Sequence, residues 1–362
     1  MLIPASLNMF ANSRSLCMGS SKLPRAWYTR LKTFLQGLGF TCCVHDTSLF
    51  TRHSAHGTII LLVYVDDIII TGSTAALIQG MEVSRIGSGL FLHLSKYARD
   101  LLQKAGLEKF TSQPTPMAVS SSTNGADTPF ADITHFRSLI GALQYLAITR
   151  PDIQFAVNRV VQRMHQPSEH DYHCLKRILR YIFGTLGRGL LIWPGVLDLR
   201  GFSDSDWANE KNDRKSTSGF LIFLGPNLIS WCTKKQPKVS RSSTEAEYRA
   251  LALLAAETMW VTYILHELRA THTVPALYCD NKSTICVAKN SVLHTRMKHV
   301  DTDCLFVRDE VQAGTMTVQY VPTEEQPADI LTKPLPSRQH DYLSSKLPFA
   351  SAQLSLRGDN NR

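Results

Sequence analysis

Residues Leu61-Leu-Val-Tyr-Val-Asp-Asp-Ile-Ile-Ile-Thr-Gly72 place two adjacent carboxylates between two runs of β-forming residues. Val, Ile and Tyr favour a pleated strand and Asp-Asp favours a tight turn, so the stretch predicts a buried hairpin with Asp66 and Asp67 at its tip. An ordinary core hairpin with solvated turn acids is the alternative. Two adjacent carboxylates between strands this apolar repel each other, however, unless a divalent cation binds them. We therefore interpret the tip as an ancestral metal-binding site.

The same motif carries a family resemblance. Tyr64-Val-Asp-Asp67, with Ile69-Ile-Thr-Gly72 behind it, resembles the polymerase motif of reverse transcriptases from copia-type long-terminal-repeat retrotransposons. The resemblance runs from Pro24 to about Leu347 and implies an α/β and α+β multidomain fragment of a Pol polyprotein. The implied segments are a truncated reverse transcriptase palm at 24–113, a linker with thumb or connection at 114–195, a ribonuclease H-like domain at 196–347 and a disordered tail at 348–362.

Composition limits the class of protein. The 362 residues suffice for two or three domains, and 44% hydrophobic with 19% charged residues is ordinary for a globular chain. No apolar run reaches the roughly 18 residues of a membrane span. The eight cysteines form no CxxC pair, which favours reduced thiols and an intracellular protein, cytoplasmic or nuclear. A net charge of +9 favours a polyanionic partner.

The first 23 residues do not fit the family. If codons for Asn8 to Leu23 are reread two nucleotides on, they can encode a string that runs into Pro24 and resembles the family's usual sequence before the hairpin. Cys17-Met18-Gly19 leaves almost no codon choice in this reading. We infer a one-nucleotide slip near Leu23, or a gene model that conceals one, and expect residues 1–23 to be an out-of-frame leader.

The palm segment is expected to be incomplete. Trp27 to Leu35 shows helical spacing that ends near Gly37, and a strand is predicted near Phe40. After the hairpin, Ala75–Gln79 runs straight into Gly80, where the family has a few tens of residues that include a palm helix. Five residues are too few to replace a helix that packs across a sheet.

A linker and a helical segment follow the palm. Leu90 to Leu107 is predicted as a strand and a helix, and the Pro- and Ser-rich stretch 114–124 as a linker. Ser168 is predicted to cap a helix that ends at Gly184. Three basic residues lie off the apolar stripe of this helix: Lys176, Arg177 and Arg180. They form either a solvated face or a contact with a nucleic-acid backbone, and the sequence leaves both open.

Three strands, a helix, a strand, a helix, a strand and a helix are predicted from Leu199 onward. The strands are Leu199–Trp207, Phe220–Leu224, Leu228–Trp231, Val274–Cys279 and Met316–Val321. Pro327-Ala-Asp329 enters the last helix. This order resembles a ribonuclease H of the Pol type, which implies a five-stranded mixed sheet with flanking helices.

The ribonuclease H resemblance implies four catalytic acids. They map onto Asp204, Glu247, Asp280 and Asp329. We prefer Glu247 to Glu245 because Ala246-Glu-Tyr-Arg-Ala250 aligns best with the family's helix, although either glutamate could serve in a capping box with Ser242 or Thr244. Asp204 is preferred to Asp206 because it lies on the strand, and Asp206 is the fallback.

Acids from these elements can converge only at one edge of the sheet. Carboxylate oxygens suit hard divalent cations. The resemblance therefore implies that the four acids hold two Mg²⁺ or Mn²⁺ ions, about 3.5 to 4 Å apart, and hydrolyse a phosphodiester. One such acid alone would more simply be a solvated side chain.

A basic cluster supports a nucleic-acid partner, an RNA–DNA hybrid above all. Between positions 211 and 241 the only acid is Asp213, and the basic residues are Lys211, Arg214, Lys215, Lys234, Lys235, Lys238 and Arg241. Beside the acidic edge they could hold phosphates of a hybrid, recognised by shape and 2′-hydroxyls more than by base sequence. They could equally be a solubilising surface.

Three functions remain from the sequence. The first is a metal-dependent nuclease that degrades the RNA strand of an RNA–DNA hybrid. The others are a nucleic-acid-binding remnant without turnover and a translated relic with no stable fold. The polymerase part is expected to be inactive, because the family's third palm carboxylate precedes the recognisable sequence and residues 1–23 contain no Asp or Glu. No oligomeric state is predicted.

Overall fold

The computed structural model describes residues 23–54, 57–64, 67–72, 82–106, 111–120, 128–209, 213–290 and 301–351. The chain divides into two compact units, Met1–Gln79 with Thr262–Ala270 and Gly80–Val261 with Thr271–Arg362. Within the described ranges, no helix is long and apolar enough to cross a membrane. The predicted leader lies outside these ranges except for Leu23, the first residue of the first described helix.

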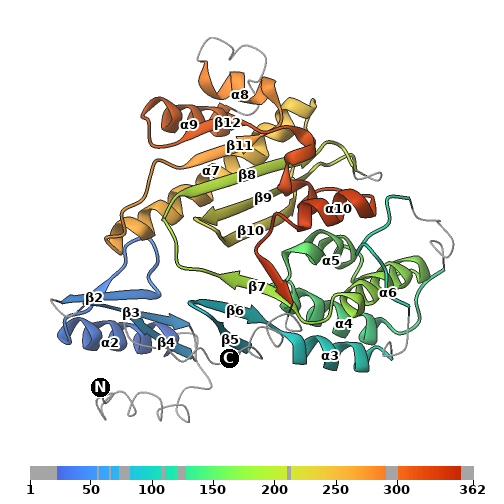
Figure 1. Ribbon diagram of the computed structural model, residues 1–362, viewed down its shortest axis with the longest axis horizontal. Helices are drawn as coiled ribbons and strands as arrows, with labels where there is room; N and C mark the ends of the chain where they lie inside the picture. Colours follow the sequence, from blue (N-terminus) through green and yellow to red (C-terminus); the bar gives the residue numbers. More distant parts are fainter. Residues whose placement is uncertain are drawn as a thin grey trace. The chain divides into compact units, whose positions relative to one another are not determined.

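The first unit pairs one helix with an antiparallel sheet (Figure 1). The helix is α2 (Leu23–Gly37), and the strands, in spatial order, are β1 (Thr41–Cys42), β2 (Leu49–Ser54), β3 (Gly57–Tyr64) and β4 (Asp67–Gly72). Leu31 and Leu35 of α2 are buried in one cluster with Phe50 and Leu61 of the sheet. The predicted helix and the strand that follows it are confirmed.

The hairpin prediction is also confirmed. β3 and β4 pair antiparallel, with Tyr64 opposite Asp67 and Ile59 opposite Gly72. Asp66 and the side chain of Asp67 lie outside the described residues, so metal binding at the tip stays a prediction. Ala75–Gln79, where palm structure is expected to be missing, also lies outside them.

The second unit contains a helical layer whose members share one buried cluster. Its helices are α3 (Ser95–Lys104), α4 (Ile133–Leu146), the 3₁₀-helix η2 (Pro151–Ile153), α5 (Gln154–Val161) and α6 (Glu169–Gly184). Leu101 of α3 shares this core with Phe136 of α4 and Ile178 of α6. The core therefore crosses the boundary predicted at residue 113. Ser168 caps α6, as predicted, because its hydroxyl accepts from the amide of Asp171 at 3.2 Å.

A buried ion pair ties the helical layer together. Arg150 binds Asp152 with two hydrogen bonds of 2.8 Å, one to each carboxylate oxygen, and both side chains are almost fully buried. The Tyr181 hydroxyl donates to Asp152 at 2.8 Å, and Arg188 reaches the same oxygen at 3.1 Å. Although burial alone would raise the pKa of Asp152, Arg150 holds that pKa well below its usual range. The network joins η2, α6 and the strand that follows α6.

That strand belongs to a sheet that the sequence predicted only in part. The sheet contains, in spatial order, β13 (Phe349–Ser351), β7 (Arg188–Ile192), β6 (Gly89–His93) and β5 (Glu82–Ile86). β6 followed by α3 is the predicted strand and helix. The disordered tail predicted at 348–362 is wrong at its start, because Phe349 pairs with Leu190 of β7 and lies under the Arg188 guanidinium.

The remaining elements build the five-stranded sheet that the resemblance to ribonuclease H implies. Its spatial order is β10 (Asn227–Lys235), β9 (Thr217–Leu224), β8 (Leu199–Asp206), β11 (Ala276–Cys279) and β12 (Thr317–Tyr320). The first three strands are antiparallel, whereas β11 runs parallel to β8 and β12 runs parallel to β11. The helices are α7 (Ser243–Glu267), α8 (Lys282–Lys289), α9 (Asp301–Gln312) and α10 (Ser337–Ser344), with 3₁₀-helices η4 (Thr323–Glu325) and η5 (Pro327–Leu331). The fold is mixed α/β, as predicted.

Two glycines allow close packing of elements on this sheet. A Cβ at Gly201 of β8 would lie 2.6 Å from a methyl carbon of Leu254 on α7. A Cβ at Gly219 of β9 would lie 2.8 Å from the Cβ of Leu331 in η5. Both distances are too short for real side chains, so α7 and η5 approach the strands only because these positions are glycine. The two elements carry Glu247 and Asp329.

Candidate active site

Asp204 lies near the carboxyl end of β8 and is 1% exposed. The Thr332 hydroxyl donates to one of its oxygens. The ammonium of Lys333 lies 3.4 Å from both oxygens of the same carboxylate. Asp204 is thus a buried acid whose partners come from the segment that follows η5.

Glu247 reaches the same strand end from the first turns of α7. It is 6% exposed, and its Oε1 accepts from the amide of Ser205 at 3.2 Å. The thiol of Cys279 donates to Oε2 at 4.0 Å. Burial first, and then the charges of Asp204 and Asp280, raise the pKa of Glu247 well above its usual value.

Asp280 follows β11, the strand next to β8. Its Oδ2 accepts from the Thr323 hydroxyl at 2.9 Å. Burial and the charge of Asp204 raise the pKa of Asp280. One ligand atom from each of Glu247, Cys279 and Asp280 lies within 4.8 Å of the other two.

Asp329 is the fourth acid and is 1% exposed. It lies in η5 rather than at the start of the last α-helix, because the turn from Pro327 is 3₁₀ and α10 begins only at Ser337. Its carboxylate lies 3.0 Å from the Lys333 ammonium. Burial and the charge of Asp204 raise the pKa of Asp329 to about 8, even though Lys333 opposes the shift. The structure therefore brings all four sequence-predicted acids together.

Lys333 is the residue that the sequence reasoning missed. Burial would lower the pKa of Lys333, yet the charges of Asp204 and Asp329 raise it. The sequence does contain an indication of this contact, because Lys333 follows Asp329 by four residues, which is the spacing of ion pairs along a helical turn. One ammonium among four carboxylates leaves the site short of positive charge.

The two rejected acids have other surroundings. Glu245 accepts from the amide of Arg241 at 2.9 Å and pairs with Arg249 at 2.8 Å, and Ser242 accepts from the amide of Glu245 at 3.1 Å. These bonds belong to the start of α7. Asp206 is half-buried and burial raises its pKa, so it lies near the site and stays the fallback.

The basic cluster lies at the same end of the sheet. In one row across the sheet, Asp206 of β8 is opposite Thr217 of β9, which is opposite Lys235 of β10. Asp213 is not isolated among the cations, because it pairs with Lys235 at 3.1 Å and with Lys215 at 3.8 Å. Lys211 lies outside the described residues.

An exposed aromatic ring stands next to these acids. Trp207 follows β8 directly and is 47% exposed. Its indole N–H donates to the carbonyl of Ser240 at 3.0 Å, which fixes the ring. Trp207 ends the Asp204–Asp206 motif, but the motif alone predicts no role for it.

The donor set fits hard divalent cations. The site offers carboxylate oxygens from four elements, and their mutual repulsion, visible in the raised pKa values of Glu247, Asp280 and Asp329, is the repulsion that a divalent cation relieves. The Cys279 thiol is a softer donor beside them. An acidic edge of this kind on a five-stranded mixed sheet defines a ribonuclease H-like domain.

Comparison with known proteins shows what the chain is similar to. The sequence profile of "Reverse transcriptase (RNA-dependent DNA polymerase)" matches residues 12–84. The Pol polyprotein of transposon RE1 from Arabidopsis thaliana is 40% identical over 365 residues, which is 94% of this chain and 25% of that polyprotein. An uncharacterized mitochondrial protein from the same plant is 48% identical over 225 residues, 55% of this chain and 93% of that protein. Over most of its length the chain is therefore homologous to a segment of the Pol polyproteins of copia-type transposons.

Two further facts qualify these matches. The chain spans about a quarter of the length of the Pol polyproteins RE1 and RE2. The reverse transcriptase match begins at residue 12, inside the predicted leader, and the displaced frame stays a prediction.

Among solved structures, LC11 ribonuclease H1 in complex with an RNA/DNA hybrid is 11% identical with a TM-score of 0.29, and the match covers 37% of this chain and 93% of that one.

Proposed function

We propose that the ribonuclease H-like domain hydrolyses the RNA strand of RNA–DNA hybrids. The observation that carries this proposal is the meeting of four buried or half-buried acids from β8, α7, β11 and η5 at one sheet edge. The raised pKa values of Glu247, Asp280 and Asp329 support this proposal, because buried carboxylates that are costly to ionise without a counter-charge are typical of functional sites.

The four acids share one task in this proposal. Asp204, Glu247, Asp280 and Asp329 would hold two Mg²⁺ or Mn²⁺ ions, which when bound supply an activated water and stabilise the leaving oxygen. The amide of Ser205 orients Glu247, and the hydroxyls of Thr332 and Thr323 orient Asp204 and Asp280. These bonds fix the carboxylates before substrate arrives.

The surroundings of the acids suit a nucleic acid. The row that ends in Lys235 places positive charge beside the acidic edge. The fixed, exposed ring of Trp207 offers a flat apolar surface on which a base or sugar can stack without regard to sequence. Recognition of a hybrid would rest on backbone shape and 2′-hydroxyls.

A second candidate function is binding without turnover. Lys333 favours it, because its ammonium already lies 3.0 Å from Asp329 and 3.4 Å from Asp204, where a divalent ion would have to bind. A chain in which Lys333 occupies the metal position could still bind a hybrid through the basic cluster.

The purified full chain distinguishes the two functions. With Mg²⁺ it is expected to cut the RNA of a hybrid, to leave single-stranded RNA largely intact and to stop when a chelator is added. Hybrid binding with no cleavage at any Mg²⁺ or Mn²⁺ concentration would establish the second function. Cleavage that survives chelation would remove the metal-dependent mechanism.

We also infer that this chain does not extend a primer. The support is the nine-residue segment between Gly72, the end of β4, and Glu82, the start of β5. So short a segment leaves no room for the palm helix that the family has there. Primer extension on an RNA template that is abolished by Asp66→Asn would contradict this inference.

A further inference from the structure

A groove of about 680 Å³ lies on the helical layer. It is bounded by segment 113–120, by Ala156 and Val160 of α5 and by α6. Lys176, Arg177 and Arg180 of α6 line it together with His170 and His173. None of its lining residues is an Asp or Glu. We call this feature the α6 groove.

The cations of the α6 groove are held in place. The Lys176 ammonium lies 4.8 Å from the centre of the Tyr172 ring, and the Arg177 guanidinium donates to the Thr115 hydroxyl at 2.8 Å. Lys176 and Arg180 are one helical turn, about 6 Å, apart along α6. Two neighbouring phosphates of one strand are thus within reach of one row of cations.

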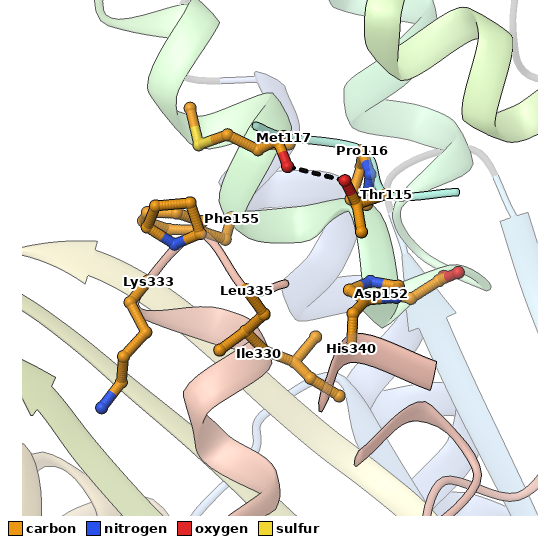
Figure 2. A pocket seen from close by; sticks show the side chains of 11 residues that line it. Thr115, Pro116, Met117, Asp152, Phe155, Ile330, Lys333, Leu335 and His340 are labelled. Atoms are coloured by element: carbon orange, nitrogen blue, oxygen red, sulfur yellow. Dashed lines mark hydrogen bonds between the residues drawn. The ribbon is translucent and has the colours of Figure 1, made fainter. Parts of the chain in front are cut away.

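The α6 groove is linked to the acidic edge through a small cavity. Pro116, Met117 and Ala156 line both the groove and this cavity of about 10 Å³, and Lys333 lines the far side of the cavity (Figure 2). The same Lys333 contacts Asp204 and Asp329. The groove and the acids therefore lie close together in the fold.

Helix α5 gives independent support for this proximity, because Ala156 and Val160 of α5 line the groove. α5 itself contacts α6 on one side and β10 and η5 on the other.

From these observations we propose that the α6 groove binds the sugar-phosphate backbone of the nucleic acid whose cleavage position lies at the four acids. The inference rests on the proposed nuclease function and adds a second contact on the connection segment. A polyanion fits because the lining carries only positive charge, and proximity to the acidic edge favours the substrate itself over an unrelated anion. The groove would lengthen the bound stretch and raise affinity without reading base sequence.

The test measures binding of the full chain to RNA–DNA hybrids of graded length, from about 6 to about 24 base pairs, at several salt concentrations. Asp280→Asn is present throughout to prevent cleavage. We expect affinity to rise with length, and Lys176→Gln combined with Arg180→Gln to remove that rise. For the longest hybrid the loss should be roughly tenfold, with a salt slope smaller by about 1.5. The shortest hybrid should bind almost unchanged.

Arg99→Gln, an exposed cation on α3 outside the groove, is the matched control. His173→Glu puts an acid into the groove at an exposed position, and it should cause the same length-dependent loss without disturbing buried contacts. Length-independent binding, or equal losses in the groove variants and in Arg99→Gln, would overturn the proposal. Because cleavage is assayed separately with Asp280 intact, failure of the nuclease function appears as absent cleavage and not as altered length dependence.

Discussion

The chain carries two groups of acids that arise in opposite ways. Asp66 and Asp67 are neighbours in sequence, so no tertiary packing is needed to bring them together. Asp204, Glu247, Asp280 and Asp329 are far apart in sequence and meet only because β11 adds beside β8 while α7 and η5 pack on the sheet. A short motif can survive when the rest of its domain is lost. A four-acid edge exists only while the whole fold is intact, so it is the stronger indication of present function.

Neutralising one acid in each group tests most directly which group is needed for cleavage. Asp280→Asn is expected to reduce hybrid cleavage by at least about 100-fold, because it removes a ligand charge where transition-state charge must be stabilised. Asp66→Asn should leave cleavage unchanged. Initial rates of the full-length variants on one hybrid decide the matter. Equal losses in the two variants would place the nuclease site at the hairpin.

Asp213→Asn is the matched control within the ribonuclease H-like domain. Asp213 pairs only with cations of the basic cluster and lies outside the acid group. Its loss should change cleavage by no more than a few-fold. A loss as large as that of Asp280→Asn would mean that the site is misplaced.

Much of this edge was predictable from the sequence. The order of strands and helices predicts the sheet, and the resemblance to ribonuclease H implies the four acids. Lys333 was missed because a single basic residue after Asp329 looks like a surface cation until the fold buries it against Asp204. Its place depends on tertiary packing.

The domain limits were harder to predict, because short strands pair across long sequence gaps. β7 and β13 lack the alternation that marks a strand, yet Leu190 of β7 shares a buried cluster with Leu221 and Leu331, and Phe349 of β13 packs against that cluster. The ribonuclease H-like core therefore extends beyond the limits of 196–347. This is why the experiments above use the full chain.

Metal-linked stability tests which acid group binds a divalent cation. Saturating Mg²⁺ at about 100 times its dissociation constant should raise the free energy of unfolding by about 2.7 kcal/mol. Asp204→Asn should abolish this gain, whereas Asp67→Asn should retain it. Thermal unfolding with and without Mg²⁺ measures both. A gain that survives Asp204→Asn but disappears in Asp67→Asn would assign the cation to the hairpin.

Without metal, the free energy of unfolding should depend on pH, because the buried acids are difficult to ionise. Burial raises the pKa of Asp329 to about 8, above the usual value in an unfolded chain. Between about pH 4 and pH 8 the folded state therefore holds a proton that the unfolded state has released, and stability falls as pH rises, by about 1 kcal/mol per unit. Asp329→Asn should flatten this slope in chelator and Asp67→Asn should not. A slope unchanged in Asp329→Asn would show that this carboxyl is not the group that titrates.

The smallest expected effect concerns the cations that accompany each acid group. Lys234 is exposed on β10, one residue before Lys235 in the row beside the acidic edge, whereas Arg30 is exposed on α2 in the hairpin unit. If the basic cluster holds substrate phosphates, Lys234→Gln should weaken hybrid binding only a few-fold. It should also reduce the slope of log affinity against log salt concentration by somewhat less than 1, because one contact is lost. Arg30→Gln should change neither quantity. Cleavage rates at saturating hybrid should stay close to wild type in both variants, since neither side chain reaches the reacting phosphate in this proposal. If Arg30→Gln weakens binding as much as Lys234→Gln does, the net positive charge of the chain attracts the hybrid and the basic cluster is not a specific binding surface.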